Sequence, residues 1–127
     1  MIVVDASAAV SALLNAGSAR QALAEEQVHV PHLIDSEVAN ALRRGVATSR
    51  VESGEARAAL VGWGRLGLWR YATFPLLERV WELRENLSAY DASYVALAES
   101  LDCALLTADV RIGRSPGLRC LVTVVPR

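Results

Sequence analysis

The sequence has 127 residues, 53% of them hydrophobic, and a formal net charge of −1. A chain of this size fits one compact domain with a buried core, and its charge gives no global sign of a nucleic-acid or membrane partner. All 13 basic residues are Arg, which excludes any chemistry that needs a Lys.

The N-terminal residues contain no basic region and reach an acid at Asp5, so we expect no signal peptide. No apolar stretch approaches the roughly 20 residues of a membrane span. Cys103 and Cys120 each lie in or beside an apolar run, which favours two buried free thiols. We therefore expect a single cytoplasmic domain over residues 1–127.

Short apolar runs rich in β-branched residues predict strands, and longer runs with apolar residues three and four apart predict helices. The first half of the chain is predicted as a strand over 2–4, helices over 6–16 and 18–26, a strand over 28–31, and helices over 33–48 and 52–66. Gly17 is a good stop for the first helix. Gly62, Gly64 and Gly67 are expected to break the last one.

The second half is predicted as a strand over 68–72, a helix over 75–86, a helix that carries Asp91, a strand over 103–106, a short turn or helix over 110–114 and a strand over 121–125. Pro75 suits the first turn of its helix, and Ser88 suits the N-cap of the Asp91 helix. The 103–106 run is apolar without alternation, as in a strand buried on both faces. Alternating strands and helices predict a three-layer α/β/α fold with a central, mainly parallel sheet.

Three of the five Asp residues occupy positions from which they can converge. Asp5 and Asp109 each follow an apolar strand directly, and Asp91 heads the helix that leads into the second of these strands. In a parallel sheet the carboxyl ends of the strands lie along one edge, where open α/β sheets bind ligands. Glu37, on a helix that follows a strand, is expected near that edge if the helix register allows it. A single acid is better explained as a cap or turn residue, but the set favours a shared site.

Converging carboxylates need a reason, because they repel one another. Two unit charges roughly 4 Å apart repel by about 4 kcal/mol at an effective dielectric of about 20, and each raises the pKa of the other. A hard divalent cation removes the repulsion, and oxygen ligands without His or Cys favour Mg²⁺ or Mn²⁺ over Zn²⁺. Such a site can lower the pKa of water and stabilise displacement at phosphorus. Ser7 and Thr107 place hydroxyl groups two residues from Asp5 and Asp109.

Four short motifs follow one another along the chain. They are VVDAS at residues 3–7, EVANAL at 37–42, YDASYVALA at 90–98 and LLTAD at 105–109. Each motif alone is weak, but the four in this order resemble the PIN domain and, more narrowly, the VapC toxins of VapBC toxin–antitoxin pairs. The resemblance covers nearly the whole chain.

The resemblance implies a PIN-like fold and a Mg²⁺-dependent endoribonuclease that a small VapB-like antitoxin holds inactive. Mn²⁺ is expected as a substitute metal, RNA as the substrate and a homodimer as the assembly. The catalytic acids on the family pattern are Asp5, Glu37, Asp91 and Asp109, with the three Asp residues as metal ligands. A hydroxyl is usual at position 107, as here. Ser7, Asn40 and Thr107 are expected in supporting roles.

Four Arg residues close to the acids could hold RNA phosphates on either side of the scissile bond. They are Arg43, Arg44, Arg111 and Arg114. For each Arg singly, a solvated helix face is the better explanation. Asn40, one turn from Glu37, is either its hydrogen-bond partner or an ordinary surface residue.

Other aromatic and His residues have less specific patterns. His29 and His32 span a strand end, so their side chains are expected to point apart and not to bind a metal. Tyr90 and Tyr94 could stack on a base, although the helical spacing of Tyr94 is more typical of a core residue. Residues 60–69, rich in Trp and Gly, either form a surface for a second copy or the antitoxin, or pack in the core.

Two further readings of the acids remain. The chain could be another metal-dependent phosphoryl-transfer enzyme, but a haloacid-dehalogenase-like phosphatase needs a second Asp where Ser7 stands, and a receiver domain needs a Lys. It could also be a PIN-like module that binds a partner without catalysis, although the intact acids argue against this.

Overall fold

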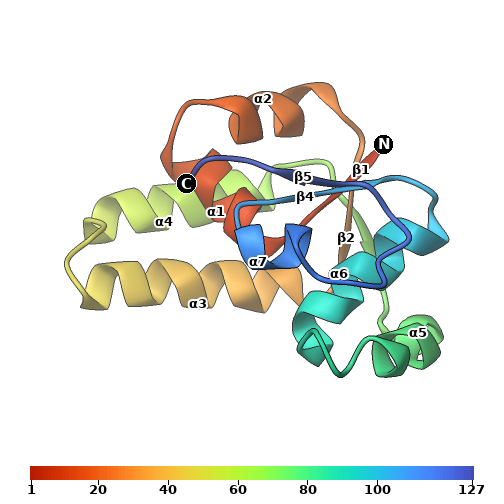
Figure 1. The fold of residues 1–127 in the computed structure, drawn as a ribbon. Helices are drawn as coiled ribbons and strands as arrows, with labels where there is room; N and C mark the ends of the chain where they lie inside the picture. The colour runs from red at the N-terminus through yellow and green to blue at the C-terminus, as the bar shows by residue number, and fades with distance from the viewer.

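A computed structural model describes residues 1–127 and contains one five-stranded sheet in the order β3-β2-β1-β4-β5. The strands are β1 (Ile2–Val4), β2 (Val28–Pro31), β3 (Trp69–Tyr71), β4 (Ala104–Thr107) and β5 (Val122–Val124). Every neighbouring pair is parallel. All five predicted strands are therefore confirmed, and the sheet is wholly parallel (Figure 1).

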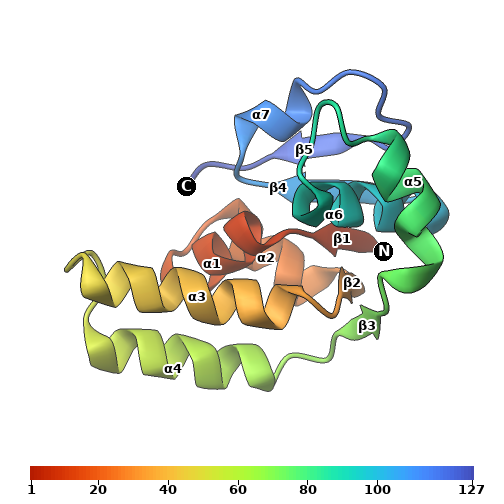
Figure 2. The same cartoon turned by 90° about the horizontal axis from the view of Figure 1, so that it is seen from below.

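Helices cover both faces of the sheet, as predicted for three layers (Figure 2). They are α1 (Ala6–Leu14), α2 (Ser18–Glu25), α3 (Ile34–Ala47), α4 (Ser53–Gly64), the 3₁₀ turn η1 (Phe74–Leu76), α5 (Leu77–Glu82), α6 (Ala89–Ser100) and α7 (Val110–Gly113). Helix α1 packs on α2, α3 and α4 on one side of the sheet, while α6 contacts β1, β2 and β4 on the other side and is backed by α5. No helix of the protein is long and apolar enough to span a membrane.

The predicted break of the fourth helix at Gly62 is wrong. Helix α4 continues through Gly62 and ends at Gly64. The buried side chain of Trp63 donates a hydrogen bond from Nε1 to Asp35 on α3 at 2.8 Å. This tertiary contact fixes the last turn of α4 and outweighs the low helix propensity of its glycines.

Two other boundaries differ from the predictions. The helix predicted over 75–86 begins as the 3₁₀ turn η1 and ends at Glu82, after which i→i+3 hydrogen bonds such as Arg84 N to Trp81 O tighten the backbone into turns. Strand β4 begins one residue later than predicted and includes Thr107, which pairs with Val124 of β5.

The core lies along the central strands and α6. Val3 and Val4 of β1 are fully buried, and every residue from Ala92 to Ala98 is buried because α6 lies between the sheet and α5. This explains why α6 has no polar face in its middle. It also fixes the helix firmly with respect to β1, so that the position of its first turn is well defined.

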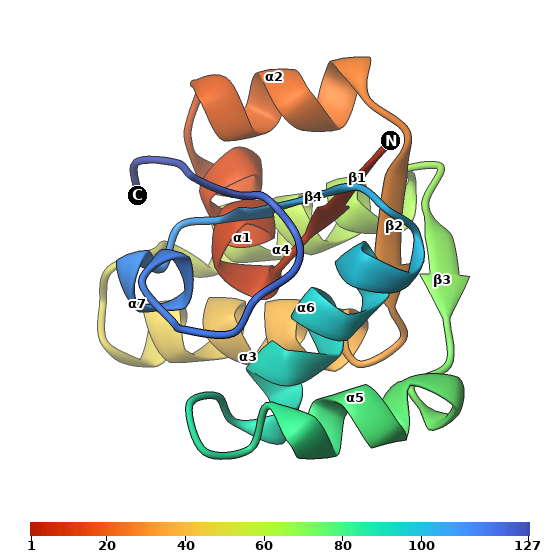
Figure 3. The same cartoon turned by 45° about the vertical axis from the view of Figure 1, so that its right-hand side comes forward.

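Strand register places the ends of β1 and β4 side by side. Val4 pairs with Leu106, and the backbone N of Asp5 donates to Leu106 O at 3.1 Å. The first turns of α1, α3 and α6 gather around these carboxyl ends (Figure 3). The topology therefore assembles one edge of the sheet from four segments that are distant in sequence.

Candidate active site

Each of the four predicted acids stands at or near the start of a helix at this edge. Asp5 follows β1 and caps α1, accepting a hydrogen bond from Ala8 N at 3.0 Å. Asp109 follows β4 and caps the short α7. Asp91 lies in the first turn of α6, and Glu37 lies in the first turn of α3. The partial positive charge of helix N-termini favours carboxylates at all four positions.

Two hydroxyl groups hold the carboxylate of Asp5, which is only 4% exposed. Ser7 Oγ donates to Asp5 Oδ1 at 2.6 Å, and Thr107 Oγ1 donates to Asp5 Oδ2 at 2.5 Å. These two hydrogen bonds hold both carboxylate oxygens in place, so the orientation of the Asp5 carboxylate is fixed. Ser7 and Thr107, expected in supporting roles, lie directly against Asp5.

The same hydroxyls connect Asp5 to the strand that carries Asp109. Ser7 Oγ accepts from Ala108 N at 2.9 Å, and Thr107 Oγ1 accepts from Asp109 N at 3.0 Å. The two oxygens are 3.3 Å apart. This hydrogen-bonded cluster joins the ends of β1 and β4 and fixes the backbone at both acids.

Glu37 has a partner that the sequence did not reveal. The hydroxyl of Tyr94, on α6, donates to Glu37 Oε1 at 2.5 Å, and the Tyr94 side chain is 1% exposed. Tyr94 is thus a core residue, as its spacing favoured, and base stacking is excluded. A signal did exist, because Tyr94 stands three residues after Asp91 and shares its helix face.

The carboxyl groups influence one another electrostatically. Burial is the main cause that raises the pKa of Asp5, Glu37 and Asp91. The charges of Asp5 and Asp109 raise the pKa of Asp91 further, and those of Asp91 and Asp5 raise the pKa of Glu37. The structure therefore brings the four acids into one electrostatic neighbourhood.

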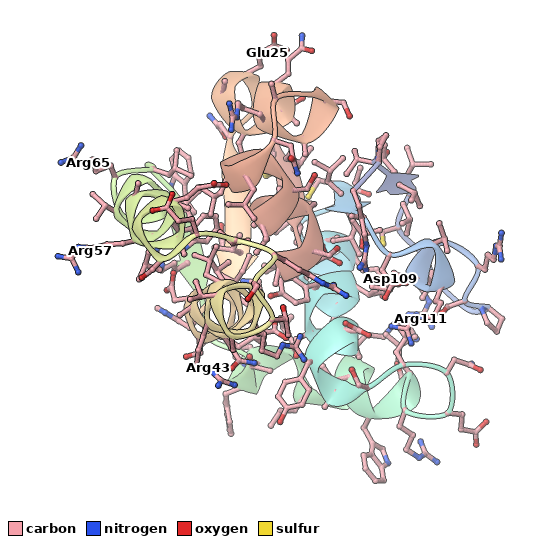
Figure 4. All side chains as sticks on the ribbon, turned by 90° about the vertical axis from the view of Figure 1, so that its left-hand side faces the viewer. Glu25, Arg43, Arg57, Arg65, Asp109 and Arg111 are labelled. Atoms are coloured by element: carbon pink, nitrogen blue, oxygen red, sulfur yellow. The ribbon has the colours of Figure 1, made fainter.

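Asp109 differs because Arg111 neutralises it. Arg111 donates from Nε to Asp109 Oδ1 at 3.1 Å and from Nη2 to Oδ2 at 2.6 Å. These bonds hold the pKa of the Asp109 carboxyl below its ordinary value. The Arg111 side chain is 81% exposed and the Asp109 side chain 14% exposed, so the guanidinium covers the acid from the solvent side (Figure 4).

The donor chemistry of this edge suits a hard divalent cation, because every group is a carboxylate or hydroxyl oxygen. Burial, together with the neighbouring carboxylates, raises the pKa of three of the acids, and a cation among them would oppose this shift. The side chains are not drawn together around one point: no three acidic, His or Cys groups are arranged to hold a metal ion. A metal would therefore have to draw the acids together and displace Arg111 from Asp109.

Asn40 does not make the expected contact with Glu37. Its Oδ1 accepts from Arg43 Nε at 3.1 Å and from Arg43 Nη2 at 3.0 Å. The i,i+3 spacing of these two residues on a helix favours this pair.

The other sequence candidates lie away from the acids. His29 Nδ1 lies 2.6 Å from the Tyr71 hydroxyl, and His32 is exposed, so the two His residues do not form a metal site. The stretch 60–69 is divided: Trp63 is buried, while Leu60 and Trp69 are 43% and 50% exposed. Core packing is therefore confirmed for Trp63, whereas a surface for a second copy or the antitoxin stays a prediction for the exposed residues. The thiols of Cys103 and Cys120 are free and half-buried, less buried than expected.

Comparisons with known proteins agree with this arrangement. A model of the PIN domain matches residues 2–118. The chain is 58% identical over 127 residues to VapC ribonuclease Mb0985 of Mycobacterium bovis, covering 100% of both chains. It is 45% identical over 128 residues to ribonuclease VapC1 of Mycobacterium tuberculosis, covering 97% of this chain and 96% of the relative.

Solved structures show the same fold at lower sequence identity. A toxin–antitoxin complex from Klebsiella pneumoniae contains a chain that matches with a TM-score of 0.68 and 20% identity, covering 100% of both chains. Mycobacterium tuberculosis VapC20, described as a toxin that cleaves the sarcin–ricin loop, matches with a TM-score of 0.66 and 22% identity over 90% of this chain and 94% of that chain.

Proposed function

The chain belongs to the PIN-domain family, among its VapC endoribonuclease toxins, and we propose that Asp5, Asp91 and Asp109 bind Mg²⁺ for the hydrolysis of RNA phosphodiester bonds. The observation that carries this proposal is the gathering of four carboxylates from four segments at one edge of the sheet. Burial and the neighbouring acids raise the pKa of three of them. We expect Mn²⁺ to substitute for Mg²⁺.

Each acid has a distinct role in this proposal. Asp5 is the fixed ligand, because two hydroxyls orient it; Asp91 and Asp109 approach from α6 and from the end of β4. The bound cation would polarise the scissile phosphate and lower the pKa of water. Glu37 is the proposed catalytic base, and it would take the proton at Oε2, because Oε1 accepts from Tyr94.

Ser7 and Thr107 are positioning residues in this proposal. Their hydroxyls donate to the two oxygens of Asp5. Oδ1 also accepts from Ala8 N, so Oδ2, with one donor, is the oxygen that keeps a lone pair for a metal. Because the two residues also bind the backbone at Ala108 and Asp109, they keep the distance between the first and last acid fixed.

We further propose a small VapB-like antitoxin as the cytoplasmic partner, by analogy with the toxin–antitoxin complex of similar fold. Its inhibitory segment is proposed to place a basic side chain among the acids, where it would supply the charge of the cation. The ion pair of Arg111 with Asp109 shows that a guanidinium fits at this edge. A homodimer is also proposed, and light scattering on the purified chain would establish the assembly.

The test is cleavage of a total RNA pool by the purified chain, with the cut ends mapped. We expect cleavage with Mg²⁺ or Mn²⁺ and none with excess chelator. Undiminished cleavage in chelator would refute the metal site. Absence of cleavage under every metal condition, by a folded protein, would instead support the module that binds a partner without catalysis.

A further inference from the structure

A groove of about 380 Å³ lies between α1 and α3, and Glu37 forms part of its lining. Given the proposed ribonuclease function, we propose that this groove binds the RNA strand on one side of the scissile phosphate, with Arg44 and Arg127 as its phosphate contacts. The proposal depends on four residues of the lining, which are Ser7, Glu37, Arg44 and Arg127.

The groove begins at the active site. Glu37 forms part of its wall together with Ser7, whose hydroxyl contacts Asp5. Arg44 lies seven residues after Glu37 on the same helix, which is about 10 Å along the helix axis. That separation is sufficient for a backbone phosphate other than the one being cleaved.

Arg44 is available for a ligand. None of the five ion pairs of the protein includes Arg44, and its guanidinium makes no hydrogen bond within the chain. Thr48 contacts only the backbone oxygen of Arg44. An exposed guanidinium beside a groove, without an internal partner, retains its capacity for a bidentate phosphate contact.

Arg127 lies on the opposite side of the groove. The segment after β5 runs over α1, where Ser11 Oγ donates to Pro126 O at 3.2 Å, and Arg127 Nε lies 3.5 Å from Ala108 O. The charge of Arg127 also contributes to lowering the pKa of Asp109. Arg127 thus lies between the groove and the acids.

The neighbouring Arg43 has a different environment. Its guanidinium donates twice to Asn40 Oδ1, it does not line the groove, and it points away from α1 (Figure 4). The two adjacent Arg residues carry the same charge on the same helix but face different surroundings. Arg43 is therefore a matched control for Arg44.

The charge of the groove favours RNA over a basic protein segment. Two Arg residues and one acid, Glu37, are the charged residues of its lining. The proposed inhibitory segment of the antitoxin is itself basic, so the two Arg residues would repel it. Phosphates of a single strand would be attracted, and the small side chains of Ala6 and Ala41 leave room for an extended chain.

The experiment measures binding separately from cleavage. A fluorescently labelled single-stranded RNA is titrated with wild type, Arg44→Ala and Arg43→Ala in chelator, at several salt concentrations, and binding is followed by anisotropy. We expect Arg44→Ala to weaken binding about tenfold and to reduce the slope of log K against log salt by about 0.7, the value for one lost phosphate contact on a single strand. Arg43→Ala should stay within about twofold of wild type.

The proposal would be overturned if the two substitutions weakened RNA binding equally, or if Arg44→Ala left RNA binding unchanged. Unchanged RNA binding by Arg44→Ala is also what we expect if the groove holds a protein segment. Arg44→Lys should retain most of the salt dependence, because it keeps the charge. Equal melting temperatures of the variants would establish that they fold alike. If wild type cleaves RNA and Arg44→Ala binds normally, the groove proposal fails and the function stands. If binding behaves as expected and wild type does not cleave, the proposed function fails instead.

Discussion

The Tyr94 hydroxyl donates to Glu37 Oε1, so a buried residue of α6 holds a candidate catalytic acid of α3, 57 residues away in sequence. Tyr94 is otherwise surrounded by the core, and its carboxylate contact raises the pKa of the phenol, after burial itself. Tyr94 therefore stays protonated and acts only as a donor. The consequence is that one Glu37 oxygen is fixed while the other stays free.

Replacing Tyr94 by Phe should reduce activity more than stability. The ring still fills its place in the core, so the loss in unfolding free energy should be about 1 kcal/mol. Without the donor, Glu37 loses its orientation, and cleavage should fall about tenfold or more, as for other groups that orient a catalytic residue. RNA cleavage rates and thermal melting test this. An unchanged cleavage rate in a stably folded variant would remove Tyr94 from the site.

Replacing Asp91 by Asn separates catalysis from folding. Cleavage with Mg²⁺ should fall by orders of magnitude, because the metal loses a ligand. The metal-free protein should become no less stable, since repulsion from Asp5 and Asp109 is relieved. Cleavage with Mg²⁺ and the melting temperature in chelator are the two measurements.

The control is Asp102→Asn, at an exposed Asp in a left-handed conformation (φ 52°) that Asn also adopts. It should leave both quantities unchanged. If Asp91 were only a helix-start residue, Asp91→Asn would lower stability by at most about 1 kcal/mol and cleavage would survive. Lost cleavage together with a large loss of metal-free stability would show a structural carboxylate instead.

The backbone positions of the acids and the hydroxyls beside Asp5 were predictable from the sequence, whereas the side-chain partners of Glu37 and Asn40 were not. Asp5 and Asp109 each follow an apolar strand, and parallel topology brings such positions together whatever the details of packing. The partner of Glu37 depends on how α3 is rotated against α6, which is a tertiary property. The same is true of Asn40, which accepts from Arg43 and makes no hydrogen bond with Glu37.

Helix α4 shows a similar limit to what the sequence predicts. Gly62 predicts a break from local propensity, and the helix nevertheless continues through it to Gly64. The contact of Trp63 with Asp35 stabilises it, and this contact joins residues 28 positions apart. Local patterns carry no information about such a partner. The helix itself was therefore predicted from the sequence, but its continuation through Gly62 was not.

Replacing Arg111 by Ala should make metal binding tighter. Arg111 occupies both oxygens of Asp109, so a cation has to displace it. We expect Arg111→Ala to bind Mn²⁺ severalfold more tightly in calorimetric titration, and to melt at a lower temperature in chelator, because Asp109 loses its counter-charge. Arg114→Ala, at an exposed position three residues later and outside every ion pair, is the control. Weaker Mn²⁺ binding by Arg111→Ala alone would show that Arg111 supports the site.

The metal-free protein should become more stable as the pH falls below neutral, which is opposite to the usual effect of carboxyl groups. Burial and, to a lesser extent, neighbouring charges raise the pKa of Asp5, Glu37 and Asp91 in the folded state. At neutral pH their ionised forms therefore destabilise the fold relative to the unfolded chain. As the pH falls through the raised folded-state values, the folded protein binds protons before the unfolded chain does, and stability increases until the ordinary carboxyl pKa of about 4 is reached.

Other carboxyls oppose this trend at lower pH. Arg partners hold the pKa of Asp35, Glu99 and Asp109 below the ordinary value. Their stabilising contribution is present above the unfolded-state pKa and is lost as the pH falls through the folded-state values.

The melting temperature in chelator should therefore pass through a maximum in the mildly acidic range. Cleavage with Mg²⁺ should fall over that same range, because a metal needs ionised ligands. Melting curves from about pH 7 to about pH 3 test this, and Asp91→Asn should show a smaller rise on acidification. A melting temperature that only decreases from neutral pH downward would contradict the raised pKa values and, with them, the repulsion that the metal is proposed to relieve.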